Sequence, residues 1–153
     1  MMKKYLFVAL LILALTLCGC ESKNIGNCAD IIHRDIHLDM TIEEIESEIE
    51  GKECSESKES YGKMIYTFSD VTLGDYSGSC VYWIENGKVT FFRFDFDDYK
   101  EFAAFVNQFF ENYGKAAKKL DVVNAGMWKG SLDGKKAQFY IDIDDKEIEI
   151  TIK

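Results

Sequence analysis

The sequence contains no proline among its 153 residues and only two histidines, His33 and His37. The absence of proline excludes a long, rigid proline-rich stalk, because proline is what stiffens such linkers. The histidines are four residues apart, a spacing at which two side chains on a helix share a metal ion. However, no glutamate follows the first as in the H-E-x-x-H motif of zinc enzymes. We therefore interpret both as surface residues and predict no metal site.

Recognisable catalytic and phosphate-binding motifs are also missing. The chain has no G-x-S-x-G nucleophile elbow, no glycine-rich phosphate loop and no C-x-x-C pair. Aspartate and glutamate total 27, so carboxylate pairs occur throughout and identify no acid–base site. We predict no catalytic residue and no cofactor, and a hydrolase without a recognisable motif is kept only as an alternative.

There is one long apolar run, residues 5–17, and it follows Lys3 and Lys4. As a helix its 13 residues span about 20 Å, whereas the hydrocarbon core of a bilayer is about 30 Å thick. The run is therefore too short for a comfortable transmembrane helix. Its length and basic flank are typical of a secretory signal peptide.

The run ends in Leu17-Cys18-Gly19-Cys20, which resembles the lipobox of bacterial lipoproteins. The resemblance implies acylation of Cys20, cleavage after Gly19 and stable anchoring by two or three acyl chains. An ordinary cleaved signal peptide is the alternative. We predict a lipoprotein signal peptide at 1–19, a lipidated N-terminus and spacer at 20–29, and one domain at 30–153. The protein would be anchored outside the cytoplasmic membrane, in the outer membrane if the host has one, because Glu21 rather than aspartate follows the cysteine.

Positive charge is scarce. Removing residues 1–19 takes away two lysines and no acid, which lowers the net charge from −9 to −11. Such a surface repels nucleic acids and anionic lipid headgroups, and it attracts basic proteins or divalent cations. We therefore predict no nucleic-acid partner.

Three cysteines, Cys28, Cys54 and Cys80, remain once Cys18 has been removed and Cys20 carries lipid. Pairing is favoured in an oxidising compartment. We predict a Cys54–Cys80 disulfide because Cys28 lies near the tether. Pairing with Cys28 and a free buried thiol remain open.

Two helices are indicated by capping boxes, and each is followed by a glycine stop: Thr41-x-x-Glu44 with Gly51, and Asp98-x-x-Glu101 with Gly114. The second helix has an apolar face made of Phe102, Phe105, Val106, Phe109 and Tyr113, which Phe110 would widen. Strands are predicted at 64–68, 80–85 and 88–97, with a loop at 52–60 and a further β region at 127–153. The turn Asn86-Gly87 would pair Glu85 with Lys88, Trp83 with Thr90, and Val81 with Phe92.

These elements predict an α+β fold with two main helices packed on one face of an antiparallel sheet. Residues 87–98 and 134–145 share a pattern of turn, phenylalanine and aspartates at an offset of 47 residues. This echo is consistent with a duplicated helix-plus-meander unit with halves 38–98 and 99–153, although any two amphipathic strands after a turn look alike.

Four aspartates, Asp95, Asp97, Asp142 and Asp144, project to the same relative face of the predicted strands. Aspartate is disfavoured in strands, and opposed like charges cost roughly 0.2–1 kcal/mol per pair. The simpler interpretation is a solvated face that resists aggregation. The functional interpretation is a docking face for a basic partner, or a weak Ca²⁺ site.

Two resemblances bear on function. The pattern Asp39-Met40-Thr41-x-Glu43-Glu44, with Ile49-x-Gly51, resembles the opening of envelope lipoprotein modules of the outer-membrane assembly (SmpA/OmlA) type and of β-lactamase-inhibitory-protein-like domains. Those modules bind other proteins. Residues 71–150, with Phe94-x-Phe96 and Trp128, resemble small bacterial lipoproteins of unassigned function. The resemblances imply a non-enzymatic protein-interaction module of the cell envelope. An inhibitor or immunity lipoprotein against a basic hydrolase such as a lysozyme is the alternative.

Overall fold

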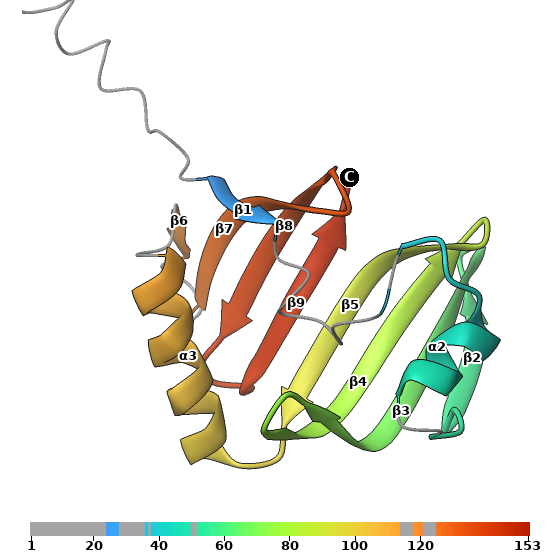
Figure 1. The fold of residues 1–153 in the computed structure, drawn as a ribbon, viewed down its shortest axis with the longest axis horizontal. Coiled ribbons are helices and arrows are strands. Elements are labelled where there is room, and N and C mark those ends of the chain that lie inside the picture. Colours follow the sequence, from blue (N-terminus) through green and yellow to red (C-terminus); the bar gives the residue numbers. More distant parts are fainter. Residues whose placement is uncertain (1–23, 28–35, 37, 50–51, 114–117, 121–124) are drawn as a thin grey trace, which may run out of the picture.

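The computed structural model describes residues 24–27, 36, 38–49, 52–113, 118–120 and 125–153. They form one sheet and two helices: β1 (Asn24–Asn27), α2 (Ile42–Glu48), β2 (Glu56–Ser60), β3 (Lys63–Leu73), β4 (Tyr76–Glu85), β5 (Lys88–Phe96), α3 (Tyr99–Tyr113), β6 (Lys118–Leu120), β7 (Ala125–Leu132), β8 (Lys135–Asp142) and β9 (Glu147–Ile152). The strand order is β1-β7-β8-β9-β5-β4-β3-β2, and β6 also pairs with β7 (Figure 1). All pairs are antiparallel except β1 with β7.

The predicted fold class is wrong, because the described molecule is mainly sheet and does not have two main helices. Helix α2 has only seven residues, and the sheet has nine strands. The segment 52–60, predicted to be a loop, contains β2, whose sequence Glu-Ser-Lys-Glu-Ser has no apolar residue. This strand forms because its backbone pairs with β3 from Glu56↔Thr67 to Ser60↔Lys63 while its side chains remain in water. A short, charged strand is well suited to a sheet edge, where it discourages pairing with other chains.

A short strand lies within the predicted spacer at 20–29. Residues 24–27 are strand β1, which pairs in parallel with β7 through Asn24↔Lys129 and Asn27↔Ser131. The chain therefore joins the sheet only four residues after Cys20. Cys20 and Cys28 themselves lie outside the described residues, as do both histidines.

The first capping box is confirmed. The backbone N–H of Glu44 donates to Thr41 Oγ1 at 3.4 Å, and the N–H of Thr41 donates to Glu44 Oε2 at 2.8 Å. Helix α2 buries Ile45 and is capped at its end by Ile49, while the predicted stop Gly51 lies outside the described residues.

The second helix begins as predicted at Asp98, but its box is only half formed. Asp98 Oδ1 accepts from the backbone N–H groups of Lys100 (2.7 Å) and Glu101 (3.2 Å). The Glu101 side chain turns away and accepts from the N–H of Ser77 at 2.7 Å. This bond ties the start of α3 to the start of β4.

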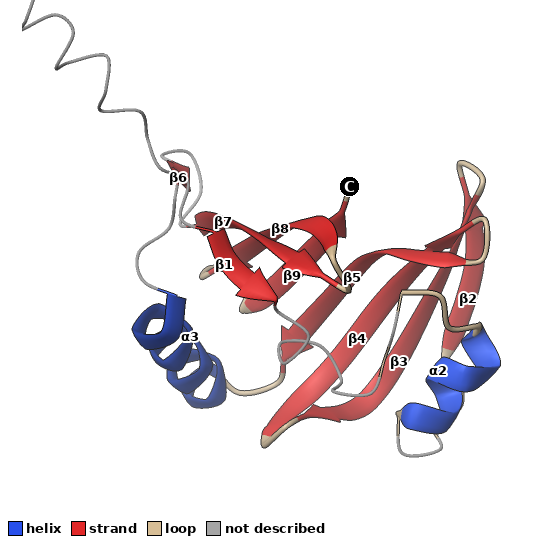
Figure 2. Cartoon of the chain, turned by 45° about the horizontal axis from the view of Figure 1, so that its top comes forward, coloured by secondary structure: helices blue, strands red, loops and turns tan. Residues whose placement is uncertain are grey.

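Both helices lie on the same side of the curved sheet and contribute to one core (Figures 1 and 2). The predicted face of α3 is confirmed, since Phe102, Phe105, Val106 and Phe109 are buried. Phe110 does not widen that face: it is 41% exposed, and its ring lies 5.6 Å from that of Trp128. The edge of the Phe109 ring also meets Trp128, with 4.9 Å between centroids, so α3 packs on the sheet mainly through aromatic contacts.

The Asn86-Gly87 turn is confirmed, with φ values of 53° and 72°, and Glu85 pairs with Lys88. The register beyond it is wrong by one residue. Trp83 pairs with Phe91 instead of Thr90, because the strand pair shifts between Trp83 and Ile84. This bulge places Val89 and Phe92, three residues apart, in the same core and leaves Phe91 on the other face.

Each predicted half contains a helix followed by four strands, and the last strands, β5 and β9, pair with each other at the centre of the sheet. The 47-residue echo does not relate equivalent strands. It aligns β5, the fourth strand after α2, with β8, the third strand after α3. The echo therefore arises from the shared chemistry of strands that follow a tight turn.

Candidate functional site: the open face of the sheet

The face of the sheet opposite the helices is here called the open face. Its side chains alternate along the strands with those that point into the core, and none of them belongs to the core cluster. Cross-strand register assigns to it Ile65, Thr67, Val81, Trp83, Phe91, Arg93, Asp95, Gln138, Tyr140, Asp142, Glu147, Glu149 and Thr151. They come from five adjacent strands, β3, β4, β5, β9 and β8.

An aromatic pair forms the apolar part of the open face. The rings of Trp83 and Phe91 face each other across β4 and β5, with centroids 4.4 Å apart and planes at 32°. Ile65 is the neighbour of Trp83 on β3, and Val81 is two residues along β4. A hollow of about 580 Å³ lies over these residues and extends to Arg93, Glu149 and Thr151. Lys58 and Lys63 line its other side, and Lys63 Nζ lies 5.6 Å from the centroid of the Trp83 ring. Contiguous apolar groups outside a core mark candidate interaction sites.

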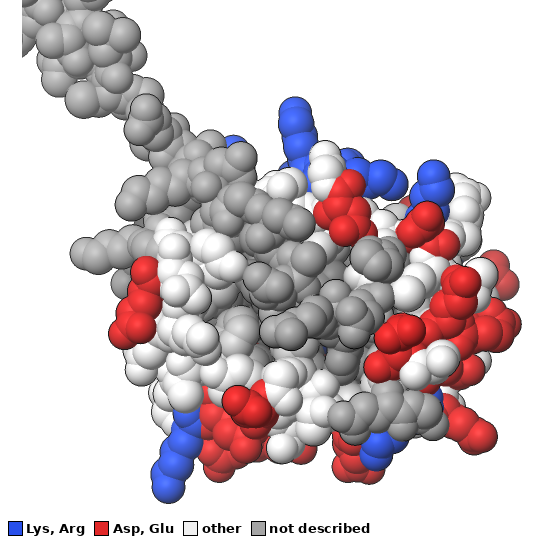
Figure 3. Space-filling view, viewed as in Figure 1, with Lys and Arg blue, Asp and Glu red and all other residues white. Residues whose placement is uncertain are grey.

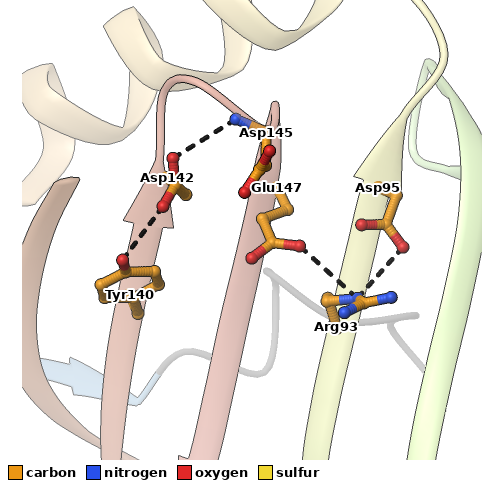
Figure 4. A network of polar contacts seen from close by, with 6 residues as sticks. All are labelled: Arg93, Asp95, Tyr140, Asp142, Asp145 and Glu147. Atoms are coloured by element: carbon orange, nitrogen blue, oxygen red, sulfur yellow. Dashed lines mark hydrogen bonds and ion pairs between the residues drawn. The ribbon is translucent and has the colours of Figure 1, made fainter. Parts of the chain in front are cut away.

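Carboxylates form the other part. Asp95, Glu147 and Asp142 are direct neighbours on β5, β9 and β8, and Glu149 pairs with Arg93 in the next row. Arg93 Nε lies 3.1 Å from Asp95 Oδ2 and 3.6 Å from Glu147 Oε2 (Figure 4). Arg93 is thus the one cation within a group of four neighbouring acids, so the group has a surplus of negative charge.

This surplus perturbs proton binding. Burial and the neighbouring carboxylates of Glu149 and Asp95 raise the pKa of Glu147 to about 7, although Arg93 acts in the opposite direction. Burial also raises the pKa of Glu149. Both effects disfavour the charged form of a glutamate that lacks enough positive partners. Glu147 therefore exchanges its proton near neutral pH, and an arriving cationic group would favour release of that proton.

Asp142 has a structural role within the group. Its Oδ2 accepts from the Tyr140 hydroxyl at 3.0 Å, and its Oδ1 accepts from the backbone N–H groups of Asp144 and Asp145 at 3.0 and 3.3 Å. These bonds shape the turn between β8 and β9. Burial, together with the bond to Asp142, raises the pKa of Tyr140 to about 12, so the hydroxyl remains a donor.

The predicted aspartate stripe is only partly formed. Asp95 and Asp142 lie on the open face, although Asp142 is only 6% exposed. Asp97 and Asp144 lie beyond the strand ends and are exposed. Sequence reasoning missed the glutamates of β9, Glu147 and Glu149, although their alternation with Ile148 and Ile150 was a usable signal. No group of three or more His, Cys, Asp or Glu side chains within the described residues could hold a metal ion.

The predicted disulfide is absent from the structure, where Cys54 and Cys80 are free thiols. Cys54 Sγ donates to the carbonyl oxygen of Glu56 at 3.0 Å. Cys80 is fully buried on the core side of β4, and burial raises the pKa of its thiol well above the ordinary value. A protonated, enclosed thiol is a poor nucleophile, so Cys80 behaves as a small core residue.

Neither helix among the described residues is long and apolar enough to cross a membrane. Comparison of the chain with protein families, with curated proteins and with solved structures finds no match. The open face is therefore interpreted from its own geometry.

Proposed function

We propose that this protein is a lipid-anchored, non-enzymatic interaction module of the bacterial cell envelope, and that its open face binds a basic protein. The anchor is acylated Cys20, outside the cytoplasmic membrane and in the outer membrane if the host has one. The observation that carries the proposal is the aromatic pair Trp83–Phe91 beside four neighbouring carboxylates, of which Asp95 and Glu147 contact Arg93. Half-buried aromatics next to a charge surplus are typical of a surface that another protein completes.

The geometry specifies the chemistry of the partner. An aliphatic or aromatic side chain would fill the hollow over Trp83 and Phe91. A lysine or arginine next to it would lie against Glu147 and Glu149 and supply the missing positive charge. Such a group would lower the pKa of Glu147, so binding near pH 7 would release a proton.

The same charge surplus favours a second candidate of narrower scope, an inhibitor or immunity lipoprotein that neutralises a basic hydrolase such as a lysozyme. Both candidates use the open face. They differ in the partner: a hydrolase whose activity falls on binding supports the second, and a partner without hydrolytic activity supports the first.

Site-specific photo-crosslinking in intact cells tests the proposal. A photoreactive residue would replace Thr151, which is exposed and lines the hollow, or, as the control, Tyr61, which is fully exposed in the turn between β2 and β3. We expect one defined basic protein to crosslink from position 151 and not from position 61. The proposal fails if positions 151 and 61 give the same crosslinked products. It also fails if the product from position 151 depends on the anchor but persists when Glu147→Lys reverses the charge on the open face.

A further inference from the structure

A basic patch lies at the end of the sheet that β1 joins. It consists of four exposed lysines: Lys129, Lys135, Lys136 and Lys153. Register brings them together, since Lys135 and Lys136 begin β8 opposite the end of β7, and the backbone N–H of Lys153 donates to the carbonyl oxygen of Lys136 at 2.8 Å. One carboxylate, Asp133, lies in the turn among them and accepts from the N–H of Leu38 at 3.0 Å. Figure 3 shows basic side chains gathered at this end, near the C-terminal residue.

The carboxylates of the open face lie at the opposite end of the same strands. Lys136 and Asp142 are the second and last residues of β8, which places their backbones about 20 Å apart at 3.3 Å per residue. Glu147 begins β9 at the acidic end, and Lys153 follows its last residue at the basic end. Although the net charge of the chain is −9, positive side chains gather at one end of these strands and negative side chains at the other.

The position of β1 brings the predicted lipid close to the basic patch. Asn24 is the fourth residue after Cys20, a reach of at most about 14 Å. Asn24 is paired with Lys129, and paired strands are about 5 Å apart. The lipid attachment point therefore lies within about 20 Å of the backbone of Lys129. Acyl chains on Cys20 would hold that point at the surface of a bilayer.

We propose that the basic patch rests against anionic headgroups of the membrane that holds the Cys20 lipid, and that the acidic end of the open face is directed away from it. The inference rests on the lipid anchor of the proposed function. Lysines close to an anionic leaflet are attracted to it over a Debye length of about 8 Å at physiological salt. The carboxylates, about 20 Å away, then lie beyond most of the screened field of the leaflet, whereas the reverse orientation would place them against the anionic headgroups, so this one orientation is favoured. In that orientation the open face remains available to a protein partner.

Amine labelling of the reconstituted protein tests the orientation. The full lipid-modified protein is placed in vesicles of zwitterionic phosphatidylcholine, or in vesicles with one third anionic phosphatidylglycerol, and treated with a water-soluble acetylating reagent. Mass spectrometry then follows each lysine. We expect Lys135 and Lys136 to react several-fold more slowly in the anionic vesicles, and about 1 M salt to remove the difference. Lys100, exposed at the acidic end where α3 begins, is the internal control and should react equally in both.

Equal rates for Lys135 and Lys136 in the two vesicles would overturn the orientation, as would equal protection of Lys100. A matched pair of variants sharpens the test: Lys135→Glu with Lys136→Glu should abolish the protection of Lys129 and Lys153, whereas Lys100→Glu should leave it unchanged. The same spectra report whether Cys20 is acylated. An acylated protein without lysine protection contradicts this inference alone, whereas an unmodified Cys20 contradicts the anchor and the orientation together.

Discussion

Phe91 and Phe92 are adjacent on β5, yet they belong to different parts of the molecule. Phe92 is 1% exposed within the core beneath the helices, whereas Phe91 lies on the open face against Trp83. The core face is almost entirely apolar and closed by α2 and α3. The open face combines aromatic rings with charged side chains around an open hollow. Residues on the core face are therefore explained by the stability of the fold. The aromatic and acidic residues on the open face are not explained by stability alone.

The open face is also electrostatically unfavourable, which the core face is not. A raised glutamate pKa means that the folded state resists the charge that the side chain would carry in water. A loss of stability of this kind is common at surfaces whose residues serve binding.

The largest expected effect separates the two phenylalanines. Phe92→Ala should lower the free energy of unfolding by about 3–5 kcal/mol, because it leaves a cavity in a closed core. Phe91→Ala should cost under about 1.5 kcal/mol, since its ring is already in contact with solvent and only the pairing with Trp83 is lost. Urea unfolding of both variants measures the difference. Similar losses for the two would show that the open face is part of the core.

A smaller effect is expected at Gly78 on β4. A methyl group on Gly78 would collide with the carbonyl oxygen of Asp95 and the ring of Phe94. Gly78→Ala should therefore cost about 1–3 kcal/mol as the strands move apart. The side chain of the neighbouring Ser79 points to the other face, so Ser79→Ala should change the free energy of unfolding by about 0.5 kcal/mol or less. Thermal unfolding compares them, and a neutral Gly78→Ala would mean that the strands separate without cost.

The smallest effect concerns Glu147 and depends on pH. Its pKa is about 7 in the folded protein against 4.5 ordinarily, so the folded state binds more protons between these values and stability falls as pH rises from 4.5 to 7. Glu147→Gln cannot ionise. It should stabilise the protein by about 1 kcal/mol at pH 8, a value reduced for solvent screening, and by little at pH 4.5. Chemical unfolding at the two pH values measures this. A loss of stability at pH 8 would show that the Arg93 contact outweighs the repulsion.

Local features of the fold were predictable from the sequence. The Thr41 and Asp98 caps, the Asn86-Gly87 turn and the apolar face of α3 each depend on residues only a few positions apart, and all are observed. The bulge was also detectable in principle. Phe92 is the third residue after Val89, a spacing that a regular strand cannot place on one face.

The features that were missed have two different causes. Strand β2 has no apolar pattern, and it forms because its backbone pairs with that of β3. The acidic group was misassigned because β5 pairs with β9, about fifty residues later, which brings Glu147 beside Asp95. No spacing along the chain reveals that neighbour. The separation of charge between the two ends of the sheet was likewise hidden in the net charge.

The most direct measurement of the central claim combines the open-face crosslink with the Phe91 substitution. A photoreactive residue at position 151 is introduced into the otherwise unchanged protein and into Phe91→Ala, and the amount of crosslinked partner is compared in intact cells. The account predicts that Phe91→Ala, while remaining folded and membrane-bound, reduces the crosslinked product at least about tenfold, as expected for a binding loss of about 1.4 kcal/mol or more at an interface anchor. An unchanged yield from a folded Phe91→Ala protein would contradict the claim that the open face is where this protein binds its partner.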